Sequence, residues 1–269
     1  MTHQGARDLI FDVGAHKGED SAFYLALGFR VVAIEANPAL VAHLRSRFAK
    51  EIEAGRFTLL DMAIADGDRQ VRFFANRTLS IWGTTNPAWA RRNRRLGTLS
   101  DEITVPGIHF GEVIRRFGCP HYLKIDIEGA DMLCIRALDG MNCRPKYISI
   151  ESTKTSWLGL LKEFAALESL GYTRFKVVDQ RRHGSGIFIG RNGEPVSYTF
   201  EKGASGPFGE DLQGRWLTKQ EALRRYLPIF VLYRTIGDNT ILSKILGHIP
   251  VLKRALSAVG WFDTHAMRT

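Results

Sequence analysis

The stretch Leu9-Ile-Phe-Asp-Val-Gly-Ala-His-Lys-Gly18 allows the fold of this 269-residue chain to be predicted. Three apolar residues lead into Asp12, and a turn with Gly14 and Gly18 follows before a helical pattern begins at Glu19. This order predicts a buried strand, a glycine-rich turn and a helix. Gly14 would let a ligand approach the backbone, and Gly18 would allow the helix to pack closely on the strand. The stretch therefore predicts the first unit of a nucleotide-binding α/β sheet.

The glycine spacing in this turn separates two classes of cofactor. It reads Gly-x-x-x-Gly, whereas dinucleotide-binding enzymes carry Gly-x-Gly-x-x-Gly. His16 and Lys17 fill the turn where those enzymes need glycine beside a pyrophosphate. An NAD-dependent oxidoreductase is therefore only an alternative, and a cofactor that carries a carboxylate fits the helix N-terminus better. Taken alone, two glycines are also compatible with an ordinary strand–helix connection.

Composition and charge limit the classes of protein to which the chain can belong. Its length suits one large domain, or one domain with an extension. Cys119, Cys134 and Cys143 show no paired spacing, so we expect neither a disulfide framework nor a zinc site, and we expect a reducing cytoplasm. No signal peptide or membrane-spanning apolar run is visible, which predicts a soluble protein. The net charge of +9 would permit attraction to phosphate or anionic lipid, although a solvated basic surface is the simpler explanation.

Strand and helix patterns alternate along most of the chain. The sequence predicts helices at 20–27, 38–54, 108–117, 132–138 and 158–170, and buried strands at 30–35, 57–64, 121–128 and 146–151. It also predicts an exposed strand at 70–76, a long loop at 78–104, and an antiparallel pair at 174–178 and 186–189 with its turn at 181–184. This order is typical of a doubly wound α/β sheet.

Acidic residues close the predicted buried strands. Those at or near strand ends are Asp12, Glu35, Asp126 and Glu151. In an open α/β sheet ligands collect beyond the carboxyl ends of the strands, so these acids mark one rim. Glu35 follows Gly14 by about twenty residues, which is the place of the acid that binds ribose hydroxyls in a βαβ unit. The end of the third strand, at 61–63, would then lie beside an adenine.

Asp126 and Glu128 form a pair of acids at the end of the strand within His121–Asp131, which also carries Lys124. Because side chains alternate in an extended chain, both acids would lie on one face. Neighbouring carboxylates raise each other's pKa unless a cation intervenes, and such a pair suits proton abstraction or metal binding. The alternative is that they cap the helix that begins near Ala130. Since no His or Cys has the spacing of metal ligands, we expect no metal.

The predicted loop at 78–104 is rich in Trp and Arg. Trp82 and Trp89 could stack on a sugar or an aromatic ring. Arg91 and the other arginines within 91–95 could steer an anionic acceptor, because guanidinium groups pair with carboxylates and phosphates. The alternative is a solvated basic helix at 87–96 that buries the tryptophans on one side.

The last third of the chain predicts a mainly helical extension, 201–269, that packs on a ligand-binding domain at 1–200. Thr218 and Glu221 have the spacing of a capping box at the start of a helix. That helix is expected at 218–226, and short amphipathic helices are expected from 227 to 259, which could cover the core, form a dimer surface or contact a membrane surface. His265 is either a base for the site or a structural histidine.

Four motifs resemble, in order, those of FkbM-type S-adenosylmethionine-dependent methyltransferases. They are Phe11–Gly18, Val32–Pro38, Val105–Ile108 and Leu123–Asp131, of which Lys-Ile-Asp-Ile-Glu-Gly is the most specific. The resemblance implies a Rossmann-like class I methyltransferase fold, with a seven-stranded, mostly parallel sheet whose final strand is antiparallel. It also implies S-adenosylmethionine as cofactor and O-methylation of a hydroxyl on a sugar or natural product, with carboxylate O-methylation as the alternative.

Carried over to this chain, the resemblance assigns roles to individual residues. The cofactor pocket comprises Asp12, Gly14, His16, Gly18, Ser21, Glu35, Ala36, Asp61, Met62 and Ala63. The residues that face the transferred methyl are Asp126, Glu128 and Glu151. Apart from the resemblance, we expect Trp82, Trp89, Arg91 and Lys124 near the acceptor. A basic protein that binds nucleic acid or a membrane surface is the alternative from another class. We expect a small-molecule acceptor and no nucleic acid, because no RNA-binding module is visible.

Overall fold

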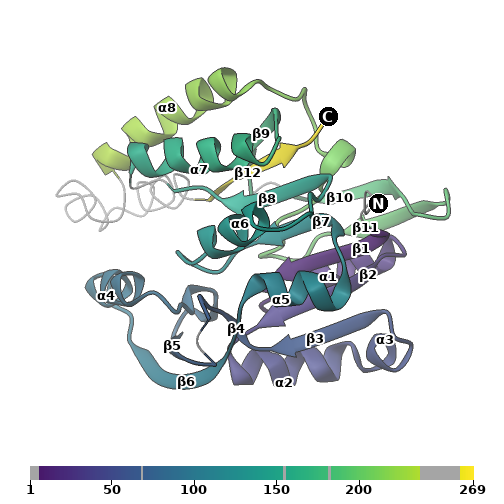
Figure 1. Cartoon of the computed structure of the whole chain (residues 1–269), viewed down its shortest axis with the longest axis horizontal. Helices are drawn as coiled ribbons and strands as arrows, with labels where there is room; N and C mark the ends of the chain where they lie inside the picture. The colour runs from purple at the N-terminus through teal and green to yellow at the C-terminus, as the bar shows by residue number, and fades with distance from the viewer. Residues whose placement is uncertain (1–5, 68, 154–155, 181–182, 237–260) are drawn as a thin grey trace.

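The computed structural model describes residues 6–67, 69–153, 156–180, 183–236 and 261–269 (Figure 1). Its main sheet has seven strands in the order β3-β2-β1-β7-β8-β12-β9. They are β1 (Ala6–Val13), β2 (Arg30–Glu35), β3 (Phe57–Asp61), β7 (Pro120–Ile125), β8 (Tyr147–Glu151), β9 (Arg174–Asp179) and β12 (Phe262–Met267). The five neighbouring strands β3, β2, β1, β7 and β8 pair in parallel, and β12 is antiparallel to both β8 and β9. The predicted α/β fold with one reversed strand is confirmed.

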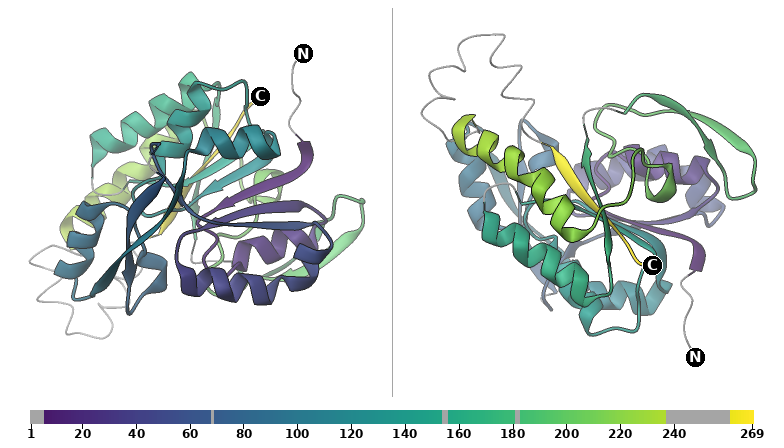
Figure 2. Two further views of the ribbon diagram at one scale, coloured as in Figure 1. Left: turned by 60° about the horizontal axis from the view of Figure 1, so that its bottom comes forward. Right: turned by 90° about the horizontal axis from the view of Figure 1, so that it is seen from above.

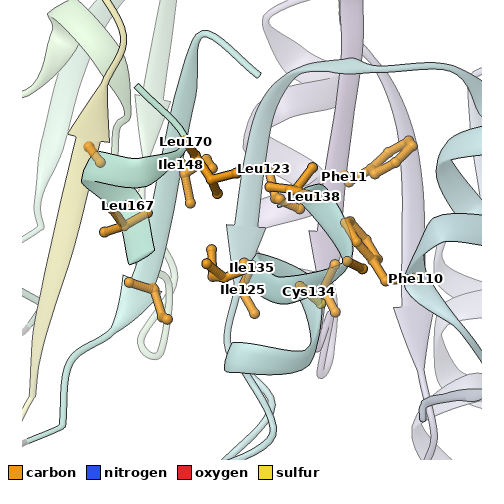
Figure 3. Close-up of a cluster of buried hydrophobic side chains, with 14 of the residues drawn as sticks. Phe11, Phe110, Leu123, Ile125, Cys134, Ile135, Leu138, Ile148, Leu167 and Leu170 are labelled. Carbon is orange, nitrogen blue, oxygen red and sulfur yellow. The ribbon is translucent and has the colours of Figure 1, made fainter. Parts of the chain in front are cut away.

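Helices cover both faces of this sheet (Figure 2). One face is covered by α5 (Phe110–Phe117), α6 (Met132–Asp139), α7 (Trp157–Ser169) and α8 (Lys219–Ile236). The other is covered by α1 (Glu19–Ala26), α2 (Pro38–Arg47) and the hairpin of β10 (Ser185–Ile189) and β11 (Pro195–Thr199). Because both faces are covered, the central strands read as continuous apolar runs. In this core Leu123 and Ile125 lie near residues of α6, and Ile148 lies near Leu167 and Leu170 at α7 (Figure 3).

The predicted pairing of 174–178 with 186–189 is wrong. Strand β9 pairs with β12 from the end of the chain, and β10 pairs with β11. Residues Phe262–Met267 carry too few apolar side chains for a buried strand to be predicted there. The strands with which they pair, β8 and β9, are remote in sequence. The division at residue 200 stays a prediction, although the sheet takes one of its strands from beyond it. Arg181 and Arg182, in the predicted turn, lie outside the described residues.

The predicted loop at 78–104 is also wrong. The basic helix of the alternative is present, but Trp82 lies outside it and both Trp82 and Trp89 are only half-buried. The segment contains the short helix η1 (Ser80–Trp82), α4 (Pro87–Arg95) and the start of β6 (Ser100–Ile108). Asn86 caps α4 by accepting a hydrogen bond from the amide of Ala88 at 2.9 Å. Strand β6 pairs with β5 (Gln70–Asn76) and with the short β4 (Ala63–Ile64) in a second sheet. The helix predicted at 38–54 is divided at Phe48 into α2 and α3 (Ala49–Glu53).

Strand and helix ends in the last third follow the sequence only in part. Thr218 and Glu221 form the predicted capping box, with the Thr218 amide donating to the Glu221 carboxylate at 2.8 Å. Helix α8 then continues to Ile236, so its predicted end at Tyr226 is wrong and 227–236 belong to the same helix. The helices predicted between 237 and 259 lie outside the described residues. Among the helices that are described, none is both long and apolar enough to cross a membrane.

A disulfide joins Cys119, just before β7, to Cys143, just before β8, with their Cα atoms 5.3 Å apart. The expectation of no disulfide is therefore wrong. The two cysteines are 24 residues apart in sequence and meet only because β7 and β8 are neighbours in the sheet. Disulfides persist mainly in oxidising environments, so the bond removes the reason for which we expected a reducing compartment. Cys134 is buried and free.

We expect Cys119→Ser to lower the free energy of unfolding by about 3 kcal/mol, because the bond closes a loop of this length in the unfolded chain. Denaturant unfolding with and without reductant measures the effect. Reductant should destabilise the parent protein and leave the variant unchanged. If reductant has no effect on the parent, the bond does not contribute to stability.

Candidate active site

A cavity of about 640 Å³ opens at the carboxyl ends of the parallel strands. The segments that follow β1, β2, β7 and β8 all contribute to it. The predicted site residues that line it are Gly14, His16, Glu35, Ala36, Met62, Ala63, Trp82, Trp89, Lys124, Asp126, Glu128 and Glu151. Residues from four strand ends and from α4 thus meet at one site, as the rim of acids predicted.

Five predicted site residues lie elsewhere. Asp12 and Ser21 are fully buried and do not line the cavity, and the Ser21 hydroxyl donates to Asp12 at 2.6 Å. Gly18 packs against the ring of Phe48. Asp61 is exposed and pairs with Arg45 at 2.8 Å. Arg91 is exposed on α4 and does not line the cavity. The roles of these five residues in binding stay predictions. Asp12, Ser21 and Gly18 support the turn, and Asp61 supports the surface around the site.

The glycine turn brings the ends of β1 and β7 together. Gly14 has a φ of +84°, and a Cβ atom built on it would lie 1.8 Å from the carbonyl oxygen of Asp126. Its amide donates to the carbonyl of Ile34 at 2.9 Å. A side chain at position 14 would therefore force β1 away from β7. The need for glycine here comes from the neighbouring backbone, which the sequence alone did not indicate.

His16 connects the turn to three other parts of the site. Its amide donates to Oε2 of Glu35 at 2.9 Å. Its ring lies 2.8 Å from Oγ of Ser80 through Nε2, and 3.1 Å from Oε1 of Glu19 through Nδ1. Its φ is +50°, which is uncommon for a residue with a side chain and is held here by these contacts. The histidine therefore fixes the turn against η1.

Glu35 and its neighbours fit the ribose and adenine of a nucleoside. The second oxygen of Glu35 accepts from the amide of Asn37 at 2.8 Å, so backbone amides orient the carboxylate towards the cavity. Burial raises its pKa. Glu35 pairs with Asp61 in the sheet, which places Met62 and Ala63 next to it. The apolar side chains that line this end of the cavity are Leu40, Met62, Ala63, Ile64 and Phe73. An acid beside an apolar slot suits a ribose attached to a purine.

Lys124 lines the cavity and belongs to a buried ionic cluster. Its Nζ is 3.2 Å from Asp12, 3.5 Å from Asp20 and 3.3 Å from the carbonyl of Gly14. Burial opposes the charge on Lys124, but the two acids still raise its pKa well above the usual value. Burial raises the pKa of Asp20 to about 6. The ammonium of Lys124 is therefore committed to acids of this chain.

The other end of the cavity is strongly acidic. Burial, with the charges of neighbouring acids, raises the pKa of Asp126 to about 7, of Asp131 to about 6 and of Glu163 to about 7. The pKa of Glu128 is raised well above its usual value by burial and by Glu151. Groups of this kind in a cavity are common in catalytic sites. Among the described residues, no group of His, Cys, Asp and Glu is arranged to hold a metal ion.

Asp126 and Glu128 meet in the cavity, but not because side chains alternate along a strand. Strand β7 ends at Ile125, and Glu128 has a φ of +48° in the following loop. Asp131 holds this loop by accepting the amides of Ile127 and Gly129, each at 3.0 Å. The strand-face prediction is therefore wrong in its reason. Asp131 was missed, although it lies in the same motif.

The raised pKa values predict an unusual dependence of stability on pH. A folded-state pKa of about 7 for Asp126, against 3.8 for an ordinary Asp, means that the folded protein binds more protons than the unfolded chain between these values. This group's contribution to stability is present below about pH 4 and is lost as the pH rises through 7. We expect Asp126→Asn to flatten this dependence when unfolding is measured between about pH 5 and pH 8.

The matched control is Asp139→Asn, since Asp139 is exposed and lies at the far end of α6. It should leave the pH dependence of the unfolding free energy unchanged. An equal change in both variants would show that Asp126 is not the titrating group.

Aromatic side chains and one arginine form the wall beside α4. The guanidinium of Arg92 lies 5.7 Å from the ring of Trp82 and 5.8 Å from that of Trp89. Arg92, and not Arg91, therefore faces the cavity, because Trp89 and Arg92 are three residues apart on the helix. Tyr233 and Trp261 from the last third of the chain also line it. The Trp–x–x–Arg spacing was the signal that could have identified Arg92.

His265 does not line the cavity. It lies on β12, 1% exposed, beside the ring of Tyr122. Burial lowers its pKa to about 3. The sequence left two roles open for His265, a base for the site or a structural residue. The structure supports the structural role.

Comparison with known proteins gives one family. The sequence model of the methyltransferase FkbM domain matches residues 12–173, more than half of the chain. No curated protein matches the chain.

Three solved structures are similar to this chain at low sequence identity and low TM-score. Precorrin-6y C5,15-methyltransferase from Geobacter metallireducens has 15% identity and a TM-score of 0.37, covering 74% of this chain and 78% of its own. A SAM-dependent O-methyltransferase from Thermotoga maritima has 10% identity and a TM-score of 0.38, covering 100% and 62%. An O-methyltransferase from Bacillus cereus in complex with SAH has 14% identity and a TM-score of 0.33, covering 71% of each chain. Because the family model matches residues 12–173, the chain belongs to the FkbM methyltransferase family and is a methyltransferase that uses S-adenosylmethionine.

Proposed function

We propose that the protein methylates a hydroxyl group of a small molecule, a sugar or another natural product. The observation that carries this proposal is the acidic end of the cavity, which lies in the same cavity as the ribose-type acid Glu35. A hydroxyl acceptor must lose its proton, and this end holds carboxyl groups whose burial raises their pKa, to about 7 for Asp126 and well above the usual value for Glu128. A cavity of about 640 Å³ has the size of a small-molecule site.

The charge of the lining favours a hydroxyl over a carboxylate acceptor. The lining acids are Glu19, Asp20, Glu35, Asp126, Glu128, Asp131, Glu151 and Glu163, and the lining arginine and lysine are Arg92 and Lys124. Lys124 is already paired with Asp12 and Asp20. A carboxylate would be repelled by these acids and would need no base. A neutral acceptor avoids the repulsion and can use the acids.

The residues present fit S-adenosylmethionine. Glu35 would hold the ribose hydroxyls, and the slot at Met62 and Ala63 would hold the adenine. The glycine turn at Gly14 and His16 would face the methionine part. When bound, the cofactor supplies a methyl group on a positively charged sulfur. The acidic lining would favour that positive charge.

Two effects of this chain's residues would account for the rate. Holding the acceptor oxygen in line with the methyl group is worth up to about 7–11 kcal/mol for well-oriented groups. Trp82 and Trp89 provide flat apolar surface against which a sugar or an aromatic ring could be positioned. Removing the hydroxyl proton contributes about 10²–10⁴ in rate, and a base whose pKa lies near neutrality is suited to it.

A screen with labelled S-adenosylmethionine against sugars, phenols and carboxylic acids tests the proposal. We expect label to appear as a methyl ether on a hydroxylated acceptor. Calorimetric titration with S-adenosylhomocysteine and with NAD provides the parallel test of the cofactor, and only the former should bind. Transfer confined to carboxylic acids, or to nucleic acid, would contradict the proposed acceptor class while leaving the methyltransferase assignment in place.

A further inference from the structure

The segment from Thr84 to Trp89 is fastened to the loop that carries Glu128. The hydroxyl of Thr84 donates to the carbonyl of Glu128 at 2.7 Å, and Nδ2 of Asn86 donates to the carbonyl of Gly129 at 3.2 Å. Nε1 of Trp89 donates to Oε2 of Glu128 at 3.0 Å. One short segment thus contacts both the backbone and the carboxylate of Glu128.

The backbone at Glu128 is strained, and these contacts hold it. A φ of +48° is uncommon for a residue with a side chain, and such conformations persist where the surroundings determine them. Gly129 has a φ of +88°, and a Cβ atom there would lie 3.1 Å from the ring of Trp89. Asp131 holds the loop from the other side through the amides of Ile127 and Gly129. Glycine at 129 therefore lets Trp89 reach Glu128.

Glu128 differs from Asp126 in how its carboxylate is held. Within the described part of the chain, no side-chain hydrogen bond fixes the carboxylate of Asp126, whereas one oxygen of Glu128 is fixed by an indole. The other oxygen of Glu128 has no hydrogen-bond partner among the described residues, and the residue lines the cavity. A general base must present a fixed oxygen to the proton that it takes.

We propose that Trp89 is a positioning residue, which holds Oε2 of Glu128 so that Oε1 receives the proton of the acceptor hydroxyl. This inference rests on the proposed function. The O–H bond of the acceptor breaks and its proton passes to Glu128. The acceptor oxygen forms the bond to the methyl carbon, and the electron pair of the broken carbon–sulfur bond stays on sulfur.

The charged groups that face Glu128 determine the direction of the expected pH effects. Asp126 and Asp131 come from its own loop, Glu151 from β8 and Arg92 from α4. The three acids raise the pKa of Glu128, and Arg92 lowers it. The indole N–H binds the ionised carboxylate most strongly, so removing it should raise the pKa further. In Trp89→Phe, the acidic limb of the pH–rate profile for methyl transfer should therefore move to higher pH. Turnover should recover as the pH is raised.

The Trp89–Glu128 contact can be tested without knowing the acceptor. Protein labelled with ¹⁵N at the indoles, in complex with S-adenosylhomocysteine, is titrated with acid while the indole N–H signals are recorded by NMR. The Trp89 signal is identified by its loss in Trp89→Phe. We expect it to move as the pH changes, and we expect Glu128→Gln to abolish that titration.

The chain offers a matched control in Trp216, whose Nε1 donates to Oε2 of Glu210 at 3.1 Å outside the cavity. Trp216→Phe should leave the Trp89 titration unchanged, and the Trp216 signal should be unaffected by Glu128→Gln. A Trp89 signal that does not titrate, or that titrates equally in Glu128→Gln, overturns the inference. Binding of S-adenosylhomocysteine by both cavity variants would show that the cofactor site is intact, so this failure is distinct from failure of the proposed function.

Discussion

Glu128→Gln is expected to lower turnover by about 10²–10⁴, the usual contribution of a positioned general base. Glutamine keeps the length of the side chain and can still accept the Trp89 indole N–H at its amide oxygen. The strained loop should therefore stay in place, and binding of S-adenosylhomocysteine should change little. Methyl-transfer kinetics with the acceptor from the screen, and calorimetry with S-adenosylhomocysteine, measure the two quantities separately.

The control variants separate the role of Glu128 from general loss of charge. Glu210→Gln removes another indole-bonded carboxylate, on the exposed surface, and should not affect turnover. Asp126→Asn removes a like charge next to Glu128, so it should lower the pKa of Glu128 and move the acidic limb to lower pH. If Asp126→Asn causes the large loss and Glu128→Gln does not, Asp126 is the base.

The sequence was sufficient to predict the parts of the fold that depend on local pattern. The order of buried strands and helices up to Leu170 follows from apolar runs and turn residues, because a parallel sheet covered on both faces leaves that pattern. The rim of acids could be predicted for the same reason, since strand ends in such a sheet meet at one edge. Glu35 and Asp126 therefore line one cavity, as their positions in the chain indicated.

Features that depend on contacts between remote segments could not be predicted in this way. Strand β12 lies between β8 and β9 although it has little apolar character, and its place depends on pairing with strands far back in the sequence. Cys119 and Cys143 meet for a similar reason. The roles of Thr84, Asn86 and Trp89 at Glu128 depend on a turn with positive φ, which the alternation of a strand conceals. Such departures from local rules are expected at functional sites.

Gly14→Ala is expected to destabilise the protein by about 3 kcal/mol or more and to abolish binding of S-adenosylhomocysteine. Alanine at a φ of +84° costs about 1–2 kcal/mol from backbone strain. The added methyl would also lie 1.8 Å from the carbonyl oxygen of Asp126, and relieving such overpacking costs typically about 1–3 kcal/mol more. Neither the added methyl carbon nor the carbonyl oxygen of Asp126 can move by a side-chain rotation. The turn or the end of β7 must therefore move. Denaturant unfolding and calorimetry measure the two effects.

Gly193→Ala isolates the part of this effect that comes from crowding. Gly193 lies between β10 and β11 with a φ of +83°, and a Cβ atom there would meet nothing within 4 Å. It should therefore show only the strain of a left-handed backbone, about 1–2 kcal/mol, and should keep its affinity for S-adenosylhomocysteine. The difference between the unfolding free energies of the two variants measures the cost of crowding against the carbonyl of Asp126. If Gly14→Ala is no worse than Gly193→Ala and still binds the ligand, the close approach of β1 and β7 is not what forms the site.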